Sequence, residues 1–349
     1  MKSRGRTASL YFRKYRTKRD PPNCSILQWS ADTNFNMAMG LVAVLRGDIF
    51  SGEKYLQKSS AIMKGGYGSD GLFHCVAGEL RYDDFDKAGK IGPWKVSKIL
   101  EGVRMARVKE HFSSLKQDQG PVIMFVRSHW FKIYPSFHTR LDEDVSLKFS
   151  SFTSHIGRTS FCVDANVCSL ITGELMATVS THSVMVSVET RRPTPIPPEL
   201  VQVQQVIPPK EKRPVSGPEF PPRPSTCFTQ KRTVLPSDTD ANNHLNQAVF
   251  IRFCFDCAGM AAIEGKLPSF VDDIIYSNTK SVWVLYVHEA EVGEELALSC
   301  WEDSASKQTI WVEIYQESQV VGQCQMQFYE DELNNSTSES KEVLAVSKL

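Results

Sequence analysis

Two segments of this sequence align with one another across a proline-rich divider. Residues 81–107, RYDDFDKAGKIGPWKVSKILEGVRMAR, can be placed over residues 235–261, LPSDTDANNHLNQAVFIRFCFDCAGMA, so that Asp86 falls on Asp240. Residues 191–226 lie between the two copies and hold more than half of the 18 prolines. Because proline removes a backbone donor and fixes φ, we expect no helix or sheet to persist in this segment. The chain should therefore fold as two related halves joined by a linker.

Each copy of the aligned segment is followed by β-rich sequence. A helix-like stretch comes first, and then short runs rich in Val, Ile, Phe, Tyr and Trp that turn signals such as ITGE and EVGEE separate. The runs are 122–134, 144–152, 159–167 and 175–189 in the first half, and 281–292, 296–302, 308–317 and 319–330 in the second. The segment 247–262 is so apolar that a helix there must be buried nearly all round. The pattern predicts an α+β fold in which an antiparallel sheet wraps around one helix in each half.

A dense group of polar side chains stands directly before this apolar segment. Residues 238–246, DTDANNHLN, include Asp240, Asn242, His244 and Asn246. One interpretation is a turn followed by a helix cap, because Asp and Asn favour both positions, and on this interpretation Asn246 is the N-cap. The other is a reaction site, because the positive end of a buried helix can stabilise negative charge.

The arrangement resembles the hotdog fold, with two copies in one chain. The turns DFDKAG (84–89) and DTDANN (238–243) resemble the D-x-D-x-x-G-like turn of hotdog thioesterases of the hydroxybenzoyl-CoA type. Asp240, Asn242 and His244 match, in order and spacing, the D-x-N-x-H of the second copy in acyl-ACP thioesterases, which are double-hotdog proteins. The segment ETRRPTPIPPEL also resembles the end of a thioesterase hotdog.

This resemblance implies an α+β protein of two tandem hotdog domains that form a pseudo-dimer. The expected parts are a basic arm with an unassigned segment (1–74), an N-terminal hotdog with a degenerate site (75–190), a proline-rich linker (191–228), a catalytic C-terminal hotdog (229–331) and a flexible tail (332–349). Whether the chain remains a monomeric pseudo-dimer or forms a homodimer stays open.

The resemblance also implies hydrolysis of fatty acyl thioesters, with no cofactor and no metal. Asp240 is the expected base or nucleophile, Asn242 would orient water or the carbonyl, and His244 would hold or exchange a proton. The family has a further acid in a Y-x-x-E context, which YVHEA supplies as Glu289. Ala290 follows it where the family has a cysteine, so no cysteine nucleophile is available there. Burial beside the helix should raise the pKa of a carboxyl group in this site.

The first copy departs from this pattern. Lys90 stands at the histidine position and Ala88 at the asparagine position. Gly92 lies opposite Asn246, so Asp86 alone remains of the polar set. A single Asp before a helix favours the role of a partner for the helix dipole. Some hotdog thioesterases work with a single Asp at this place, so Asp86 stays a candidate residue of a second site.

The nine cysteines show no framework spacing, and an odd number favours a reducing compartment. The one C-x-x-C, Cys254 and Cys257, lies inside the apolar segment. No second C-x-x-C or nearby H-x-x-x-H would complete a zinc site. We therefore expect two buried structural thiols.

The bulk charge and the apolar runs limit the partners. Lys plus Arg and Asp plus Glu are equal at 40 each, so no overall charge points to nucleic acid or to an acidic membrane surface. The longest apolar candidate, MAMGLVAVL, has half of the roughly 18 residues that a membrane span needs.

The two ends of the chain carry different targeting signals. Residues 1–20 contain eight Lys or Arg, which is typical of a transit peptide or of a disordered basic arm. The chain ends in Ser347, Lys348 and Leu349, the address that the peroxisomal import receptor reads. We therefore expect a peroxisomal protein, with the mitochondrion and the cytoplasm as alternatives, and acyl-CoA rather than acyl-ACP as its substrate.

Two other functions fit a double hotdog. An R-specific enoyl-CoA hydratase would carry D-x-N-P-x-H, but here His244 follows Asn242 by two residues and no proline intervenes. A non-catalytic acyl-binding protein is the other alternative, because the first copy already shows a degenerate site within the same chain.

Overall fold

The computed structural model describes residues 40–41, 65–77, 80, 82–112, 122–139, 146–203, 207, 213–240 and 243–330. All of them belong to one compact unit, Phe35–Leu349. Within these residues no helix is both long and apolar enough to cross a membrane.

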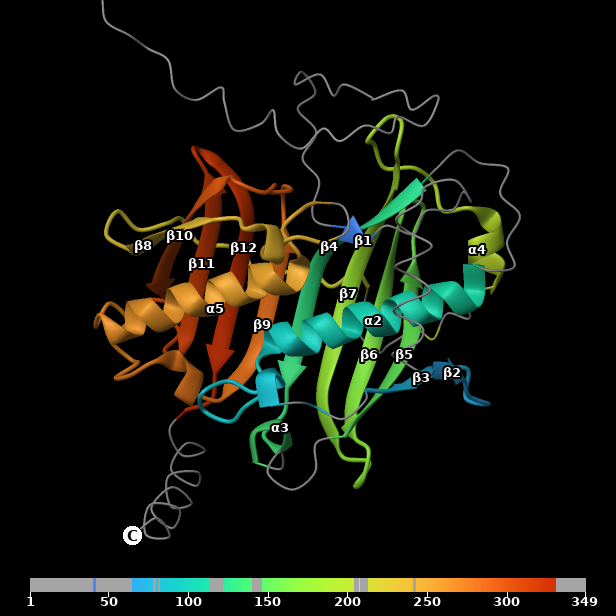
Figure 1. Cartoon of the computed structure of the whole chain (residues 1–349), viewed down its shortest axis with the longest axis horizontal. Coiled ribbons are helices and arrows are strands. Elements are labelled where there is room, and N and C mark those ends of the chain that lie inside the picture. The colour runs from blue at the N-terminus through green and yellow to red at the C-terminus, as the bar shows by residue number, and fades with distance from the viewer. Residues whose placement is uncertain are drawn as a thin grey trace, which may run out of the picture. The chain divides into compact units, whose positions relative to one another are not determined.

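One antiparallel sheet runs through the whole unit (Figure 1). Its strands lie in the order β2-β3-β5-β6-β7-β4-β9-β12-β11-β10-β8, and β1 pairs with β4. The strands are β1 (Gly40–Leu41), β2 (Gly65–Tyr67), β3 (Phe73–Val76), β4 (Val122–Ile133), β5 (Leu147–Ile156), β6 (Ser160–Ser169), β7 (Leu175–Ser187), β8 (Phe228–Thr233), β9 (Thr279–Tyr286), β10 (Glu295–Glu302), β11 (Thr309–Gln316) and β12 (Gln319–Phe328). Each of the eight runs predicted as β-rich forms one of these strands.

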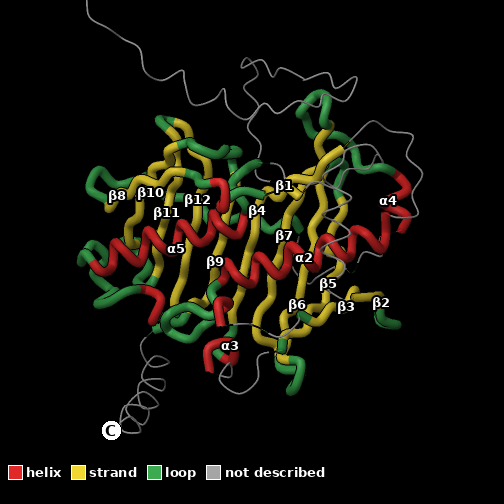
Figure 2. The backbone as a smooth tube through the Cα atoms, in the orientation of Figure 1, coloured by secondary structure: helices red, strands yellow, loops and turns green. Residues whose placement is uncertain are grey.

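Two long helices lie on the same face of the sheet, α2 (Pro93–Phe112) and α5 (Gln247–Ile263) (Figure 2). They contact each other where the halves meet. The short helices are α3 (Ser136–Thr139), α4 (Pro198–Val203) and the 3-10 turns η1 (Tyr82–Asp84), η2 (Pro236–Asp238) and η3 (Ile274–Tyr276). The helix expected at 247–262 is therefore confirmed.

The strand order repeats in the two halves. Counted from its outer side to the middle, the first half reads β3-β5-β6-β7-β4 and the second reads β8-β10-β11-β12-β9. In each half the first strand precedes the long helix, and the strand that follows the helix lies in the middle. β4 and β9 pair there, with Trp130 opposite Trp283. The aligned sequence segments thus occupy equivalent places in one continuous sheet.

The two helices differ in what they bury. Most of α5 is buried, including Phe250, Phe253 and Ala258, so this helix is surrounded by apolar side chains as its composition predicts. α2 instead buries polar and charged side chains, among them Glu101 and Arg104. Burying such groups costs free energy unless they are hydrogen-bonded or paired.

The proline-rich segment contains a helix, so the expectation that none persists there is wrong. α4 begins at Pro198, a position in the first turn at which proline is tolerated because its missing N–H would have no partner inside the helix. Leu200 N donates to Pro197 O at 3.0 Å.

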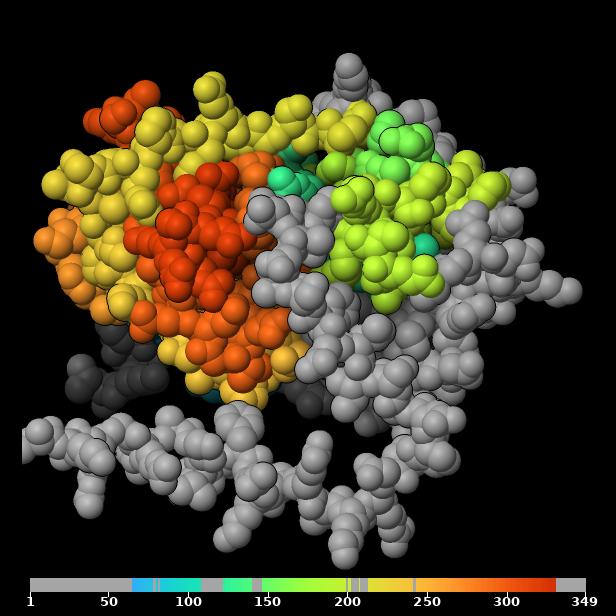
Figure 3. All heavy atoms as spheres, turned by 90° about the horizontal axis from the view of Figure 1, so that it is seen from above, coloured from blue at the N-terminus to red at the C-terminus, as the bar shows by residue number. Residues whose placement is uncertain are grey.

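The later part of the segment packs on the sheet. Phe220 makes edge contacts with Trp301 and Trp311, and Arg213 forms an ion pair with Asp164 at 2.9 Å. Neighbours of these tryptophans along the strands, such as Val312, belong to the core beneath the helices, so the tryptophans point to the opposite face. In Figure 3 the yellow residues of the segment lie along the upper side of the view, beside the orange and red strands.

Candidate functional site

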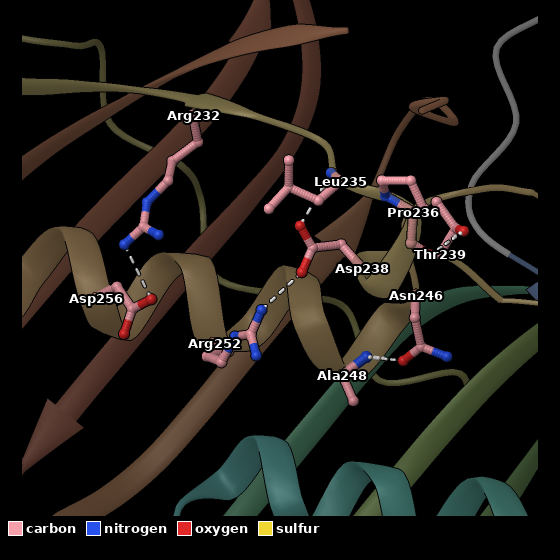
Figure 4. Close-up of polar contacts among 9 residues, drawn as sticks. All are labelled: Arg232, Leu235, Pro236, Asp238, Thr239, Asn246, Ala248, Arg252 and Asp256. Carbon is pink, nitrogen blue, oxygen red and sulfur yellow. Dashed lines mark hydrogen bonds and ion pairs between the residues drawn. The ribbon is translucent and has the colours of Figure 1, made fainter. Parts of the chain in front are cut away.

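The polar loop before α5 is tied to that helix by Asp238. This side chain is 5% exposed, and its Oδ2 atom accepts a hydrogen bond from Leu235 N at 3.0 Å. Its Oδ1 atom accepts one from Arg252 Nη2 at 2.8 Å, so the two oxygens join the start of the loop to the second turn of the helix (Figure 4). Asp238 therefore has a structural role and fixes the place of the residues that follow it.

Asn246 is the N-cap of α5, as the sequence predicts. Its Oδ1 atom accepts a hydrogen bond from Ala248 N at 2.9 Å (Figure 4). Its Nδ2 atom donates to Glu101 Oε2 at 3.0 Å, across to helix α2 of the first half. The cap thus holds the positive end of α5 against α2 and is not free for chemistry.

Backbone hydrogen bonds join the described candidate residues Asp240 and His244. Asp240 N donates to His244 O at 2.9 Å, and Asn243 N donates to Asp240 O at 3.0 Å. Asn243 has φ of 65°, a left-handed conformation that Asn adopts more readily than most residues. Asp240 is half-buried. Asn242, the third member of the expected motif, lies outside the described residues.

The structure brings His244 and Glu289 together. His244 forms a β-bridge with Glu291, and Leu245 N donates to Ala290 O at 2.7 Å, so the loop is pinned to the chain that follows β9. His244 Nε2 then lies 3.5 Å from Glu289 Oε2. The other ring nitrogen, Nδ1, is buried and has no hydrogen-bond partner among the described residues.

Arg191 is a third member of the site that the sequence analysis did not single out. Its Nη2 atom lies 2.9 and 2.8 Å from the two oxygens of Glu289. Its backbone is left-handed, with φ of 55°, and its guanidinium lies 5.3 Å from the centre of the Phe125 ring. The sequence signal for Arg191 is the resemblance of the segment ETRRPTP to the end of a hotdog domain.

A polar cavity of about 240 Å³ opens beside this ion pair. Its lining includes Arg191, His288, Glu289, Glu291 and Glu294. Glu289 is therefore reachable from a hollow in the surface while it keeps its contact with His244.

Tyr286 and Ala290 complete the wall of the site. Tyr286 is fully buried and donates its hydroxyl to Gln247 O at 3.2 Å, at the first residue of α5. Burial raises the pKa of Tyr286 well above its usual range, so the hydroxyl stays protonated. Ala290 is buried and contributes its carbonyl to the loop.

The equivalent loop of the first half has become structural. Asp86 Oδ1 accepts hydrogen bonds from Ala88 N at 2.8 Å and from Lys90 N at 3.0 Å. Burial raises the pKa of Asp86. Lys90, at the histidine position, donates to Tyr276 O at 2.9 Å and to Asn278 Oδ1 at 2.8 Å. The lysine thus joins the two halves.

Aromatic rings fill the place where a second site would lie. Trp94 packs against Phe255, with ring centroids 5.2 Å apart. The remaining cavity at Asp86 and Lys90 is about 20 Å³, the size of a single water molecule. In the alignment of 81–107 with 235–261, Ala248 replaces Trp94 and Glu101 replaces Phe255. The place equivalent to the Trp94–Phe255 ring pair is therefore occupied, beside the loop of the second half, by the small side chain of Ala248 and the acid Glu101.

Cys254 and Cys257 are fully buried on α5, as the sequence predicts. Burial raises the pKa of Cys254 well above its usual range, which keeps the thiol unreactive. In the described part of the chain, no group of three or more His, Cys, Asp or Glu side chains could hold a metal ion. Ser347, Lys348 and Leu349 lie outside that part.

Several solved structures that are similar in fold to this chain are named as thioesterases. The chain is similar to an acyl-ACP thioesterase from Bacteroides thetaiotaomicron (TM-score 0.57, 14% identity, 78% of this chain and 99% of that one). It is also similar to a 12:0-ACP thioesterase from Umbellularia californica (TM-score 0.57, 15% identity, 74% and 97%). A third similar structure, from Lactobacillus plantarum, is assigned as an oleoyl thioesterase (TM-score 0.61, 18% identity, 74% and 95%).

No protein-family model and no curated protein matches the sequence. At these identities the structures show the fold alone. The resemblance to the acyl-ACP thioesterases, predicted from two short motifs and a repeat, is confirmed at that level.

Proposed function

We propose that this protein hydrolyses acyl thioesters at one site, in its second half. The observation that carries the proposal is the convergence of His244 and Glu289 at the start of α5, in a chain with the fold of acyl-ACP thioesterases. The filled cavity at Asp86 supports a single site, because it leaves no room for a substrate in the first half.

The chemistry begins with the thioester carbonyl at the positive end of α5. This end favours the negative charge that develops on the carbonyl oxygen as the carbon is attacked. In the water route, the oxygen of a water molecule attacks the carbonyl carbon while Asp240 takes its proton. The C–S bond then breaks and the sulfur leaves with a proton that His244 supplies. The products are a carboxylic acid and a thiol.

In the alternative route, Asp240 itself attacks the carbonyl carbon, the C–S bond breaks and the sulfur leaves with a proton that His244 supplies. Water then hydrolyses the mixed anhydride to the carboxylic acid and the free carboxylate of Asp240. In both routes Asn242 orients the water or the carbonyl. Glu289 holds His244 from the side opposite its free nitrogen, and Arg191 fixes Glu289.

We assign the halves as two tandem hotdog domains that pair as a pseudo-dimer. The repeated strand order and the shared sheet support this assignment. In this assignment the N-terminal hotdog is 75–190, the linker is 191–228 and the C-terminal hotdog is 229–331. The pairing of β4 with β9 then makes the pseudo-dimer interface, and the chain needs no second copy to complete the site.

The thiol carrier is proposed to be coenzyme A, in the peroxisome. Two of the structures with this fold are named as thioesterases of acyl-ACP. The terminal Ser347, Lys348 and Leu349 instead favour import into the peroxisome, where the import receptor would be a partner. A fusion tagged at its N-terminus, imaged with and without residues 347–349, tests the address. A full-length fusion that stays in the cytosol or enters mitochondria would overturn it.

The decisive experiment compares two aspartates in purified protein. Wild type, Asp240→Asn and the matched control Asp86→Asn are given acyl-CoA, acyl-ACP and enoyl-CoA, and free thiol and the enoyl chromophore are followed. Asp240→Asn should lower kcat about a hundredfold or more, and Asp86→Asn should lower it little. Loss of the enoyl signal without thiol release would instead identify a hydratase. Binding without any reaction would identify an acyl-binding protein.

A further inference from the structure

Helix α2 carries a buried arginine that makes no hydrogen bond to the side chains described in the structure. Its buried polar residues include Glu101, Arg104 and Arg107. Arg107 donates to Tyr67 Oη at 3.1 Å and to Thr153 Oγ1, and Glu101 is bound by Lys98 Nζ at 3.1 Å and by Asn246. Arg104, which is 7% exposed, differs from both. Its Nε, Nη1 and Nη2 atoms all lack a hydrogen-bond partner in the part of the chain that the structure describes.

A second buried side chain without hydrogen-bond partners among the described residues lies near Arg104. His129, on the middle strand β4, is fully buried, and neither of its ring nitrogens has a partner among the described residues. Burial and then the charge of Arg104 lower the pKa of His129 well below its usual range, so this ring stays neutral. Gln247 Oε1, at the first residue of α5, is also buried and has no hydrogen-bond partner among the described residues. The charge of Glu101 acts on Arg104, but the carboxylate of Glu101 is bound by Lys98 and Asn246, so the guanidinium has no hydrogen-bonded acceptor among the described residues.

The fold itself does not require this charge. In the alignment of the two copies, Ala258 takes the place of Arg104 and Phe255 takes the place of Glu101. Both are buried in the apolar core of the second half, so the same helix and sheet are built there without an ion. An arginine is ordinarily protonated, and holding one in the interior without a hydrogen-bonded acceptor is costly. The arginine therefore points to an acceptor that a ligand brings.

Arg104 lies next to the proposed reaction centre. It follows Glu101 by three residues, which is a rise of about 4.5 Å along the helix. Glu101 holds Asn246, the cap of α5, and Asn246 follows His244 by two residues. The charge of Arg104 also acts on Tyr286, whose hydroxyl donates to Gln247 O at the first residue of α5, so an anion at Arg104 would be held near this end of the helix.

We propose that Arg104 binds a carboxylate on the acyl part of the substrate, so that the preferred substrates are thioesters of dicarboxylic acids. The inference rests on the proposed function and names its substrate class. One carboxylate matches the single charge of Arg104, and its two oxygens fit the planar guanidinium. A phosphate of coenzyme A fits less well, because it carries more charge and stands at the far end of the pantetheine arm.

The first experiment compares acyl-CoA pairs of equal length, one with a terminal carboxylate and one without. Butyryl- and succinyl-CoA, hexanoyl- and adipoyl-CoA, and octanoyl- and suberoyl-CoA are suitable. For at least one pair, wild type should have the higher kcat/KM for the carboxylate. In Arg104→Met this ratio should fall about tenfold or more, the scale of one charge-assisted pair. In the control Arg107→Met the ratio should stay unchanged. Equal ratios in wild type and Arg104→Met would overturn the proposal.

The second experiment needs no turnover. Free adipate should raise the melting temperature of wild type but not that of Arg104→Met. Hexanoate should raise the melting temperature of wild type less than adipate does. Without ligand, Arg104→Met should melt at or above the wild-type temperature, because it removes an unpaired buried charge. A lower melting temperature together with an equal response to adipate would make Arg104 structural and overturn the proposal.

The two experiments also separate the two proposals. If no thioester is hydrolysed but adipate stabilises the protein through Arg104, the carboxylate site stands and the proposed function fails. If unsubstituted acyl-CoA is hydrolysed and adipate has no effect that depends on Arg104, the function stands and the carboxylate site fails.

Discussion

Arg191 and Glu289 are 98 residues apart in the sequence, yet Arg191 Nη2 lies 2.9 and 2.8 Å from the two carboxylate oxygens of Glu289. Arg191 follows β7, the last strand of the first half along the chain. Glu289 follows β9, which lies in the middle of the whole sheet. Since Glu289 also lies 3.5 Å from His244, the first half supplies a cation to the site of the second.

This ion pair gives a kinetic prediction. Arg191→Gln should lower kcat about tenfold or more with little change in KM, because Glu289 and then His244 lose the position that the guanidinium fixes. Arg191→Lys should fall between wild type and Arg191→Gln, since it keeps the charge but not the planar donors. Steady-state kinetics at saturating acyl-CoA measures both variants. Arg192→Gln is the matched control, since that neighbouring side chain is exposed. Equal losses in the variants of Arg191 and Arg192 would remove Arg191 from the site.

Asp86 gives a prediction about stability and pH. Burial raises its pKa in the folded protein above the value in the unfolded chain. The contribution of Asp86 to stability is therefore complete below the unfolded pKa, about 3.9, and is lost as the pH rises through the folded pKa. Asp86→Asn keeps the oxygen that accepts from Ala88 and Lys90 but does not titrate. The free energy of unfolding of wild type, minus that of Asp86→Asn, should decrease from about pH 4 to pH 7. Urea titrations measure it, and a difference that rises with pH would contradict the burial argument.

Lys90 gives a prediction about the contact between the halves. Lys90→Met removes the hydrogen bonds to Tyr276 O and Asn278 Oδ1 and should lower the free energy of unfolding by about 1–3 kcal/mol. The matched control is Lys87→Met. That side chain is 54% exposed in its 2.6 Å ion pair with Asp273, so its loss should cost less stability than the loss of Lys90. Chemical denaturation ranks the two variants, and the reverse order would show that Lys90 does not tie the halves together.

The buried thiols of α5 give a prediction about what the site does not need. Cys254→Ala and Cys257→Ala should each cost about 1 kcal/mol of stability through lost packing and leave turnover per folded molecule unchanged. Cys257 also loses its contact with Leu298 O at 3.5 Å. Melting curves and kinetics on the same preparations separate the two effects. Loss of turnover in a double variant that still melts cooperatively would require a thiol in the mechanism.

Local patterns were sufficient to predict much of the fold. The strands show alternation or continuous apolar runs, the helix at 247–263 is apolar, and Asn246 stands at the one place where a cap is needed. The pairing of His244 with Glu289 followed from a family motif, not from local chemistry. These features depend on neighbours in the sequence or on a known pattern.

Contacts between the halves could not be predicted in this way. The ion pair of Arg191 with Glu289 and the bond of Asn246 to Glu101 depend on the pairing of β4 with β9, which no local pattern encodes. The burial of Arg104 could not be predicted either, because a helix rich in Lys, Glu and Arg ordinarily indicates an exposed face. α4 was missed because proline was read as a breaker, although it is tolerated where a helix begins.

The pairing of β4 with β9 also has a consequence during synthesis on the ribosome. Ser128 to Lys132 pair with Ser281 to Leu285, so this edge of β4 stays open until the ribosome has added about 150 more residues. At a typical rate of about 5–20 residues per second, that interval lasts roughly 10 to 30 seconds. An open strand edge is a template for pairing with another chain. On a polysome, where nascent copies are crowded, the same edge that later joins the two halves is therefore the place at which neighbouring chains would join by mistake.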